Sequence, residues 1–144
     1  MSEVVKKPGK IIIPSDQVYL QELDEFLEET LRNFSMAEGD IADVAISVTE
    51  LVNNAIVHGN ASDPDKMVDV EMILKDSSVE ITVTDEGDGI DLSDIPDPLS
   101  DENILKETGR GIFIVRSLMD EVDITAGKDG GTVVRLVKKF DPVK

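Results

Sequence analysis

The stretch that decides most about this chain is Glu50-Leu51-Val52-Asn53-Asn54-Ala55-Ile56-Val57-His58-Gly59. It continues a helical pattern in which apolar residues recur at spacings of three and four. Glu50 and Asn54 are four residues apart, so they share a helix face, which lies away from the apolar stripe through Val48 and Val52. Taken alone, the segment favours a solvated polar face at a helix end over a functional site.

Two helices are predicted in the first half of the chain. The helix that carries this stretch has capping-box spacing between Ser35 and Glu38 at its start, and Gly59 is expected to end it in a left-handed C-cap. Its buried stripe consists of the apolar residues Ile41, Val44, Ala45, Val48, Val52, Ala55 and Ile56. An earlier amphipathic helix is predicted over about residues 16–34, with Ser15 as its N-cap.

The remaining patterns predict strands and one more helix. In chain order they are a flexible tail at 1–9, a short apolar strand at 10–13, a β-hairpin at 68–75 and 79–84, a helix at 112–119, and a strand pair at 122–126 and 132–139. Runs of strands and helices without strict alternation indicate an α+β fold. We expect a single domain over residues 10–140: a two-layer sandwich whose mixed, mostly antiparallel sheet carries helices on one face.

Composition and charge narrow the function classes. The 144 residues include no cysteine and one histidine, which argues against a thiolate or His-rich metal centre. No apolar run is long enough to span a membrane and the first ten residues lack a secretory pattern, so a cytoplasmic location is expected. The net charge of −17 disfavours direct binding to nucleic acid or to anionic membranes.

Two glycine-containing segments follow the long helix in sequence. Asp85-Glu86-Gly87-Asp88-Gly89 comes directly after a predicted strand, and its glycines would let the backbone approach a flat ligand. Thr108-Gly109-Arg110-Gly111 opens the third helix, where free N–H groups and the helix dipole favour a phosphate. Each segment alone is also compatible with an ordinary turn or helix start. Neither a Walker A nor a Rossmann glycine pattern is present.

The order and spacing of these segments together resemble the GHKL ATPases, the superfamily of gyrase, the ninety-kilodalton heat-shock chaperones and the histidine kinases. The shared elements are Glu50 with Asn54, Asp85-x-Gly87-x-Gly89, Gly109-x-Gly111 and a late Gly131-Thr132. The resemblance covers about residues 37–138. The run from Glu50 to Gly59 and the segment Gly109-Arg110-Gly111-Ile112-Phe113-Ile114-Val115 are most similar to the bacterial anti-sigma factors that are also serine/threonine protein kinases.

The resemblance implies roles at the base and metal end of an ATP site. Asp85 would accept a hydrogen bond from the exocyclic amine of adenine. Gly87 and Gly89 would let the chain pass the adenine and ribose, and Thr132 would support the adenine end from its strand. Asn54 would be the direct protein ligand of Mg²⁺.

The resemblance also implies roles at the phosphate end. Gly109, Arg110 and Gly111 would bind the phosphates, residues 90–108 would be the ATP lid, and Glu50 would act as base on the attacking hydroxyl. Members of this branch can carry an arginine just before the lid-end glycines. This chain has Lys106-Glu107-Thr108 there, with Arg110 inside the motif instead.

The expected function is therefore an anti-sigma factor that binds a sigma factor and phosphorylates an anti-anti-sigma (STAS-type) partner, with homodimerisation implied by the resemblance. The acids of the first helix are a candidate docking surface, although a solvated face explains them as well: Glu22, Glu25, Glu28 and Glu29. One alternative is a non-catalytic, ATP-dependent binding module. A fragment of a histidine kinase is the other, disfavoured because His58 lies in the nucleotide-binding helix.

Overall fold

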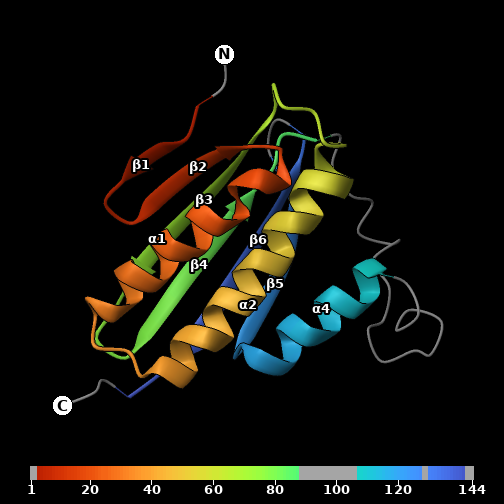
Figure 1. The fold of residues 1–144 in the computed structure, drawn as a ribbon. Coiled ribbons are helices and arrows are strands. Elements are labelled where there is room, and N and C mark those ends of the chain that lie inside the picture. The colour runs from red at the N-terminus through yellow and green to blue at the C-terminus, as the bar shows by residue number, and fades with distance from the viewer. Residues whose placement is uncertain (1–2, 88–106, 128–129, 142–144) are drawn as a thin grey trace.

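The computed structural model describes residues 3–87, 107–127 and 130–141, and for residues 107–110 it describes the backbone alone. The first half of the described chain contains β1 (Val5–Lys7), β2 (Lys10–Pro14), a 3₁₀ turn (Gln17–Tyr19), α1 (Leu20–Arg32), α2 (Glu38–Asn54) and a π-helical turn (Ala55–Gly59). The second half contains β3 (Met67–Leu74), β4 (Ser78–Thr84), α4 (Glu107–Leu118), β5 (Glu121–Ala126) and β6 (Thr132–Lys139). Figure 1 shows these elements as two layers, with the helices in front of the sheet.

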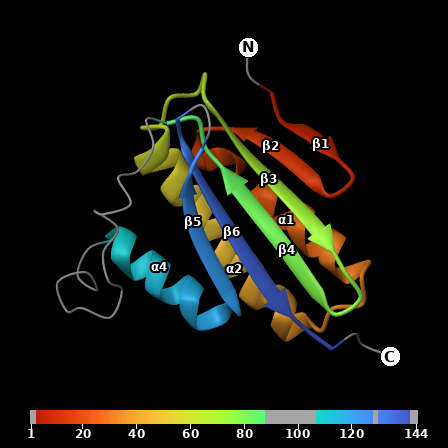
Figure 2. The same cartoon turned by 180° about the vertical axis from the view of Figure 1, so that it is seen from behind.

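The sheet has six strands in the order β1-β2-β3-β4-β6-β5. Every pair among these strands is antiparallel, so the parallel component of the expected mixed sheet is absent from the described strands. Seen from behind, one face of the sheet is open, and α1, α2 and α4 cover the other (Figure 2). The α+β sandwich with helices on one face is therefore confirmed.

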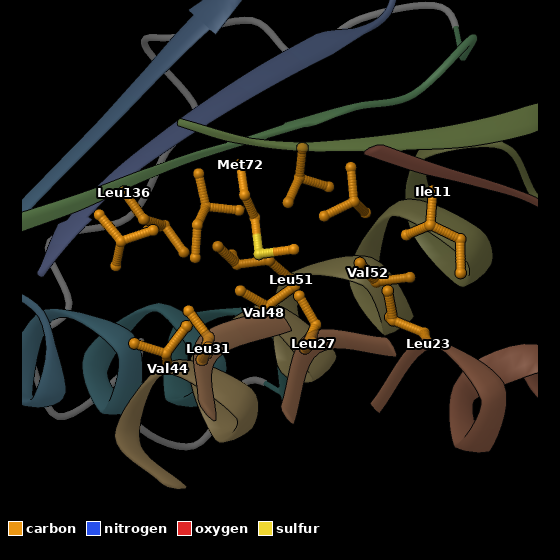
Figure 3. Packing of buried hydrophobic residues seen from close by; sticks show 14 of the residues in the cluster. Ile11, Leu23, Leu27, Leu31, Val44, Val48, Leu51, Val52, Met72 and Leu136 are labelled. Atoms are coloured by element: carbon orange, nitrogen blue, oxygen red, sulfur yellow. The ribbon is translucent and has the colours of Figure 1, made fainter. Parts of the chain in front are cut away.

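The core lies between this face and helices α1 and α2. Alternation along β3 and β4 turns every second residue toward the helices, and Val68, Val70, Val79 and Ile81 are fully buried there. Figure 3 shows Met72 and Leu136 from the sheet meeting the leucines and valines of the two helices. The inward residues of α1 are Leu23, Leu27 and Leu31. The 3.6-residue and two-residue periods of the sequence thus account for the core directly.

Residues 5–7 lie within the predicted flexible tail, yet they form a strand. Val5–Lys7 forms the edge strand β1 and pairs with β2 in the register Val5 to Ile12. Gly9, with φ of +72°, makes the turn between them. The composition of residues 1–9 hides this strand, because its side chains are exposed and it is held by backbone hydrogen bonds to β2 rather than by burial.

The expected caps at the starts of both helices are also wrong. Asp16, not Ser15, caps the first helical turn: its side chain accepts a hydrogen bond from Val18 N. Ser35 lies in the left-handed region with φ of 62°, and α2 begins after Ala37 without a side-chain cap. Glu38 pairs instead with Arg32 of α1 at 2.8 Å.

The second half of the chain follows its sequence pattern closely. The hairpin of β3 and β4 is confirmed with Leu74 opposite Val79, and Gly130 and Gly131 adopt positive φ in the turn before β6. The third helix begins five residues earlier than expected, at Glu107. In the described part of the chain, no helix is both long enough and apolar enough to cross a membrane.

Candidate nucleotide site

The site begins where α2 changes its winding. Ala55–Gly59 is a π-helical turn, closed by a hydrogen bond of 2.7 Å from Asn60 N to Ala55 O. Gly59 does not have the left-handed conformation that the sequence predicts, since the described glycines with positive φ are Gly9, Gly130 and Gly131. A glycine is needed here for a different reason. A Cβ at Gly59 would lie 2.3 Å from Oδ2 of Asp85.

Asp85, directly after β4, is 8% exposed and held by backbone donors. Its Oδ1 accepts hydrogen bonds of 3.0 Å from both Gly87 N and Thr132 N. The backbone of Asp85 also donates to Thr132 O at 3.1 Å. Two N–H donors on one oxygen hold the carboxylate in one orientation, and Oδ2 lies beside Gly59.

Glycines on three segments allow this close approach. A Cβ at Gly87 would lie 1.8 Å from Gly59 O, and one at Gly131 would lie 2.2 Å from Asp85 O. Real Cβ contacts are never this short, so larger residues at these positions would push the segments apart. The glycines around Asp85 therefore pack the end of α2 against the end of β4 and the start of β6.

A cavity of about 110 Å³ lies under this cluster, between α2, α4 and the sheet. Its apolar wall consists of Leu51, Ala55, Val83, Ile112, Ile124 and Val134, and the lining is completed by Asn54, His58, Gly59, Asp85 and Thr132. The Thr132 hydroxyl is buried there without a hydrogen-bond partner among the described groups. Such orphaned polar atoms are rare in native proteins and indicate a missing partner. An apolar slot with one acceptor carboxylate and one free hydroxyl suits a planar heterocycle that carries an amino donor.

Glu50 and Asn54 lie on consecutive turns of α2, as their spacing predicts. Asn54 faces the cavity. Glu50 is half-buried against the first turns of α4, because a Cβ at Gly111 would lie 2.5 Å from Glu50 Oε1. In the described part of the chain no cluster of three or more His, Cys, Asp or Glu could hold a metal ion by itself.

The structure thus brings together five of the predicted site residues around one end of α2: Glu50, Asn54, Asp85, Gly87 and Thr132. Gly111 joins them through its contact with Glu50. Gly109 and Arg110 lie in the first turn of α4, where the structure describes the backbone alone. Gly89 and nearly all of the expected lid at 90–108 lie outside the described residues.

Sequence reasoning missed two kinds of site residue. The apolar wall, formed by residues such as Leu51 and Ile124, looks like ordinary core in a periodicity pattern. Asn60 was also missed: its fully buried side chain donates to Ser15 Oγ and accepts from Glu86 N. A polar residue directly after the glycine that ends a helix was its only signal.

A family profile described as a histidine kinase-like ATPase domain matches residues 13–138. The chain belongs to this family, and it is accordingly an ATP-using domain of the kinase type. The cavity beneath Asp85 lies within the matched region.

Curated relatives are similar over most of the chain. The anti-sigma F factor of Heyndrickxia coagulans is 37% identical over 123 residues, which cover 83% of this chain and 76% of that protein. The anti-sigma F factor of Clostridium perfringens is 30% identical over 129 residues, covering 88% of this chain and 84% of that one.

Solved structures share the fold. The RsbU and RsbW domains of Rv1364c from Mycobacterium tuberculosis match with a TM-score of 0.67 at 23% identity, over 94% of this chain and 34% of that longer one. The mycobacterial sensor histidine kinase MprB matches with a TM-score of 0.57 at 16% identity, over 99% of this chain and 100% of that one.

Proposed function

We propose that this protein is an anti-sigma factor with serine/threonine kinase activity. It would bind ATP under Asp85, transfer the γ-phosphoryl group to a Ser or Thr of an anti-anti-sigma (STAS-type) partner, and bind a sigma factor. The names of the curated relatives support the sigma factor as a partner. The observation that carries the proposal is the Asp85 carboxylate, fixed by two backbone donors, with the free hydroxyl of Thr132 in the same cavity.

The adenine end of the site follows from these two groups. Oδ1 of Asp85 is occupied by Gly87 N and Thr132 N, so Oδ2 is the oxygen left for the amino group of the base. Thr132 as a whole is 4% exposed. Its hydroxyl gains a hydrogen-bond partner when a base or an ordered water enters the cavity. The glycines at 59 and 87 let the backbone pack closely around Asp85, which places its carboxylate at the cavity where a flat ring would bind.

The phosphate end lies along α2 toward Glu50. Asn54 offers a hard amide oxygen, which suits Mg²⁺, and with no carboxylate cluster among the described residues the ion would be shared with nucleotide phosphates. The ion, when bound, would neutralise charge that develops on the phosphoryl oxygens. At the start of α4, Gly109 would supply a backbone N–H and Arg110 a cation to the phosphates, and Gly111 would let Glu50 lie close beside them.

Glu50 is the proposed general base. Its carboxylate lies against Gly111 and also borders a second hollow of about 470 Å³ on the outer side of α1 and α2, with Asp24 and Ile46. An acceptor hydroxyl can therefore approach Glu50 from outside while the nucleotide occupies the cavity on the other side. The carboxylate would take the proton of that hydroxyl as it attacks the γ-phosphorus.

The partners complete the proposal. A sigma factor and a STAS-type protein would compete for the chain, phosphorylation of the second would decide between them, and a second copy of the chain would form a homodimer. A cytoplasmic location follows from a sigma factor as partner. With a net charge of −17, neither nucleic acid nor an anionic membrane is a proposed ligand.

Replacement of Glu50 by glutamine tests the proposed kinase activity and the role of Glu50 as its general base. Glu50→Gln should bind ATP as the wild type does, yet transfer radiolabelled phosphate to an anti-anti-sigma protein of the same genome about 10²–10⁴-fold more slowly. Glu71→Gln, the same change on an exposed residue of the open sheet face, should transfer at the wild-type rate.

Two results would oppose the proposal in different ways. Equal transfer by Glu50→Gln and wild type removes Glu50 from the chemistry. Absence of transfer by the wild type, with ATP-dependent partner binding retained, identifies the protein as a nucleotide-dependent binding module.

A further inference from the structure

Asn60 is a fully buried polar residue directly after the π-helical turn, and it does not line the cavity beneath Asp85. Its Nδ2 donates to Ser15 Oγ at 2.7 Å and to Met67 O at 3.0 Å, and its Oδ1 accepts from Glu86 N at 2.8 Å. The side chain thus joins the end of β2, the start of β3 and the turn that follows β4. These three segments are far apart in sequence.

The hydrogen-bond pattern permits one orientation of this amide. Met67 O can only accept and Glu86 N can only donate, so Nδ2 must face β3 and Oδ1 must face the turn after β4. Ser15 donates its own hydroxyl proton to Lys66 O at 2.6 Å, which leaves its oxygen free to accept from Asn60. Both N–H donors and the carbonyl oxygen of Asn60 have a partner, and so does the hydroxyl proton of Ser15, so the network favours a single arrangement.

The side-chain amide of Asn60 holds the backbone of Glu86, the residue next to Asp85, in place. Glu86 N is held by Asn60, and the Glu86 carboxylate accepts a hydrogen bond from Met67 N. Gly87, on the other side of Glu86, donates to Asp85 Oδ1. A shift of Glu86 therefore displaces Gly87 and rotates the Asp85 carboxylate, whose Oδ2 is the acceptor offered to the base.

We propose that Asn60 is a positioning residue for base recognition: it sets the direction of the Asp85 carboxylate through Glu86, and so sets the preference for adenine. This inference rests on the proposed function, because it takes ATP as the nucleotide under Asp85. The π-helical turn serves the same end, since its wider winding brings Gly59 and Asn60 against the Asp85 turn.

The test compares ATP with ITP, in which a carbonyl oxygen replaces the exocyclic amine. In the wild type an acceptor carboxylate should favour ATP over ITP by about tenfold or more. In Asn60→Ala this ratio of dissociation constants should fall by about tenfold, whereas binding of tripolyphosphate with Mg²⁺, which tests the phosphate end alone, should be unchanged. Isothermal titration calorimetry measures all three ligands.

Ser15→Ala is the matched control, because it removes one partner of the same buried network and leaves the bond between Asn60 and Glu86 in place. It should lower the midpoint of denaturant unfolding yet keep the wild-type ratio of ATP to ITP affinity. If Asn60→Ala does not fold, Asn60→Ser leaves a smaller cavity. Its hydroxyl is too short to replace the amide oxygen, so the same loss of preference is expected.

The outcomes separate this inference from the proposed function. A wild type that binds ATP no better than ITP overturns both. A wild type that prefers ATP, together with a folded Asn60 variant that keeps the preference, overturns the role of Asn60 alone. An equal loss of preference in Ser15→Ala and Asn60→Ala also overturns it, because the effect would then follow the stability of the network.

Discussion

At the scale of single residues, the Asp85 carboxylate joins two strands and faces the cavity with the same group. Oδ1 accepts from Gly87 N and Thr132 N, which ties the end of β4 to the start of β6. Oδ2 lies beside Gly59 at the cavity wall. One oxygen serves the fold and the other is available to a ligand, so the two tasks can be separated by mutation.

Asp85→Asn should separate them. The amide keeps an oxygen for the two backbone donors, and its NH₂ group replaces Oδ2 at the cavity. We expect the melting temperature to change by no more than about one degree, which corresponds to a few tenths of a kcal/mol in the free energy of unfolding. We expect a loss of ATP affinity worth about 1.5–3 kcal/mol, because an acceptor for the base becomes a donor.

Calorimetric titration with ATP and ITP measures this change. The NH₂ group should donate a hydrogen bond to the carbonyl oxygen of ITP, where Oδ2 of the wild type would accept one from the amine of ATP, so the preference should move toward ITP. Unchanged ATP affinity in a folded Asp85→Asn protein would show that the base is bound elsewhere.

At the scale of elements, α4 is attached to the rest of the domain mainly through α2 and through one lysine of β6. Lys138 Nζ donates to Leu118 O, at the C-terminal end of α4, at 2.8 Å and lies 3.3 Å from Asp43 Oδ2 of α2. The side chain of Lys138 is 14% exposed. A cation at the last carbonyls of a helix also suits the helix dipole.

Lys138→Met should therefore loosen α4. Methionine keeps the apolar stem of the lysine but lacks the ammonium group, so Leu118 O and Asp43 both lose their partner. The free energy of unfolding should therefore fall by about 1–3 kcal/mol. Hydrogen exchange at the backbone amides of 112–118 should become faster than in the wild type. Denaturant unfolding and exchange mass spectrometry measure the two effects.

Arg116→Met provides the comparison, since Arg116 is an exposed cation in the same last turn of α4. Its loss should cost less than about 1 kcal/mol, the size of a surface dipole effect. Equal losses in the two variants would mean that the general charge of the helix end, and not the bonds of Lys138, holds α4.

At the scale of the whole molecule, acid exceeds base by 17 charges. Two cations on the open face of the sheet, Lys10 and Arg135, are each shared between several carboxylates. Lys10 lies between Asp69 and Glu71, and Arg135 contacts Glu80, Glu121 and Asp123. The Glu80 and Asp123 carboxylates raise the pKa of the Arg135 guanidinium, Glu80 most strongly. Even so, unpaired acid dominates the surface.

Salt should therefore stabilise the nucleotide-free protein. Raising NaCl from about 20 mM to about 300 mM shortens the Debye length and weakens the repulsion among the acids, so the melting temperature should rise. Differential scanning calorimetry at the two concentrations checks this. A fall in melting temperature would show that the local ion pairs of Lys10 and Arg135 outweigh the overall repulsion.

The sequence by itself determined the layers of the fold, and it predicted which residues would gather at the end of α2. Alternation at 68–74 and 79–84 predicted β3 and β4, the three-and-four spacing predicted α1 and α2, and motif order placed Asp85, Asn54 and Glu50 together. These signals are local or depend on spacing alone. The periodicity of the sequence assigns each residue to one face of its helix or strand. Burial of the apolar faces against one another then stacks the helices on the sheet, and this needs no information beyond the sequence pattern.

Only the tertiary structure decided which partner each polar group and each glycine would take. Ser15 had the right place for a local cap, yet it bonds to Lys66, 51 residues away, and to Asn60, 45 residues away. Gly59 suited a left-handed helix end, yet it is required by the carboxylate of Asp85. A hydroxyl or an amide can satisfy the same bond locally or across the domain. Packing chooses between the two, because a buried group left without a partner costs more free energy than a local cap contributes.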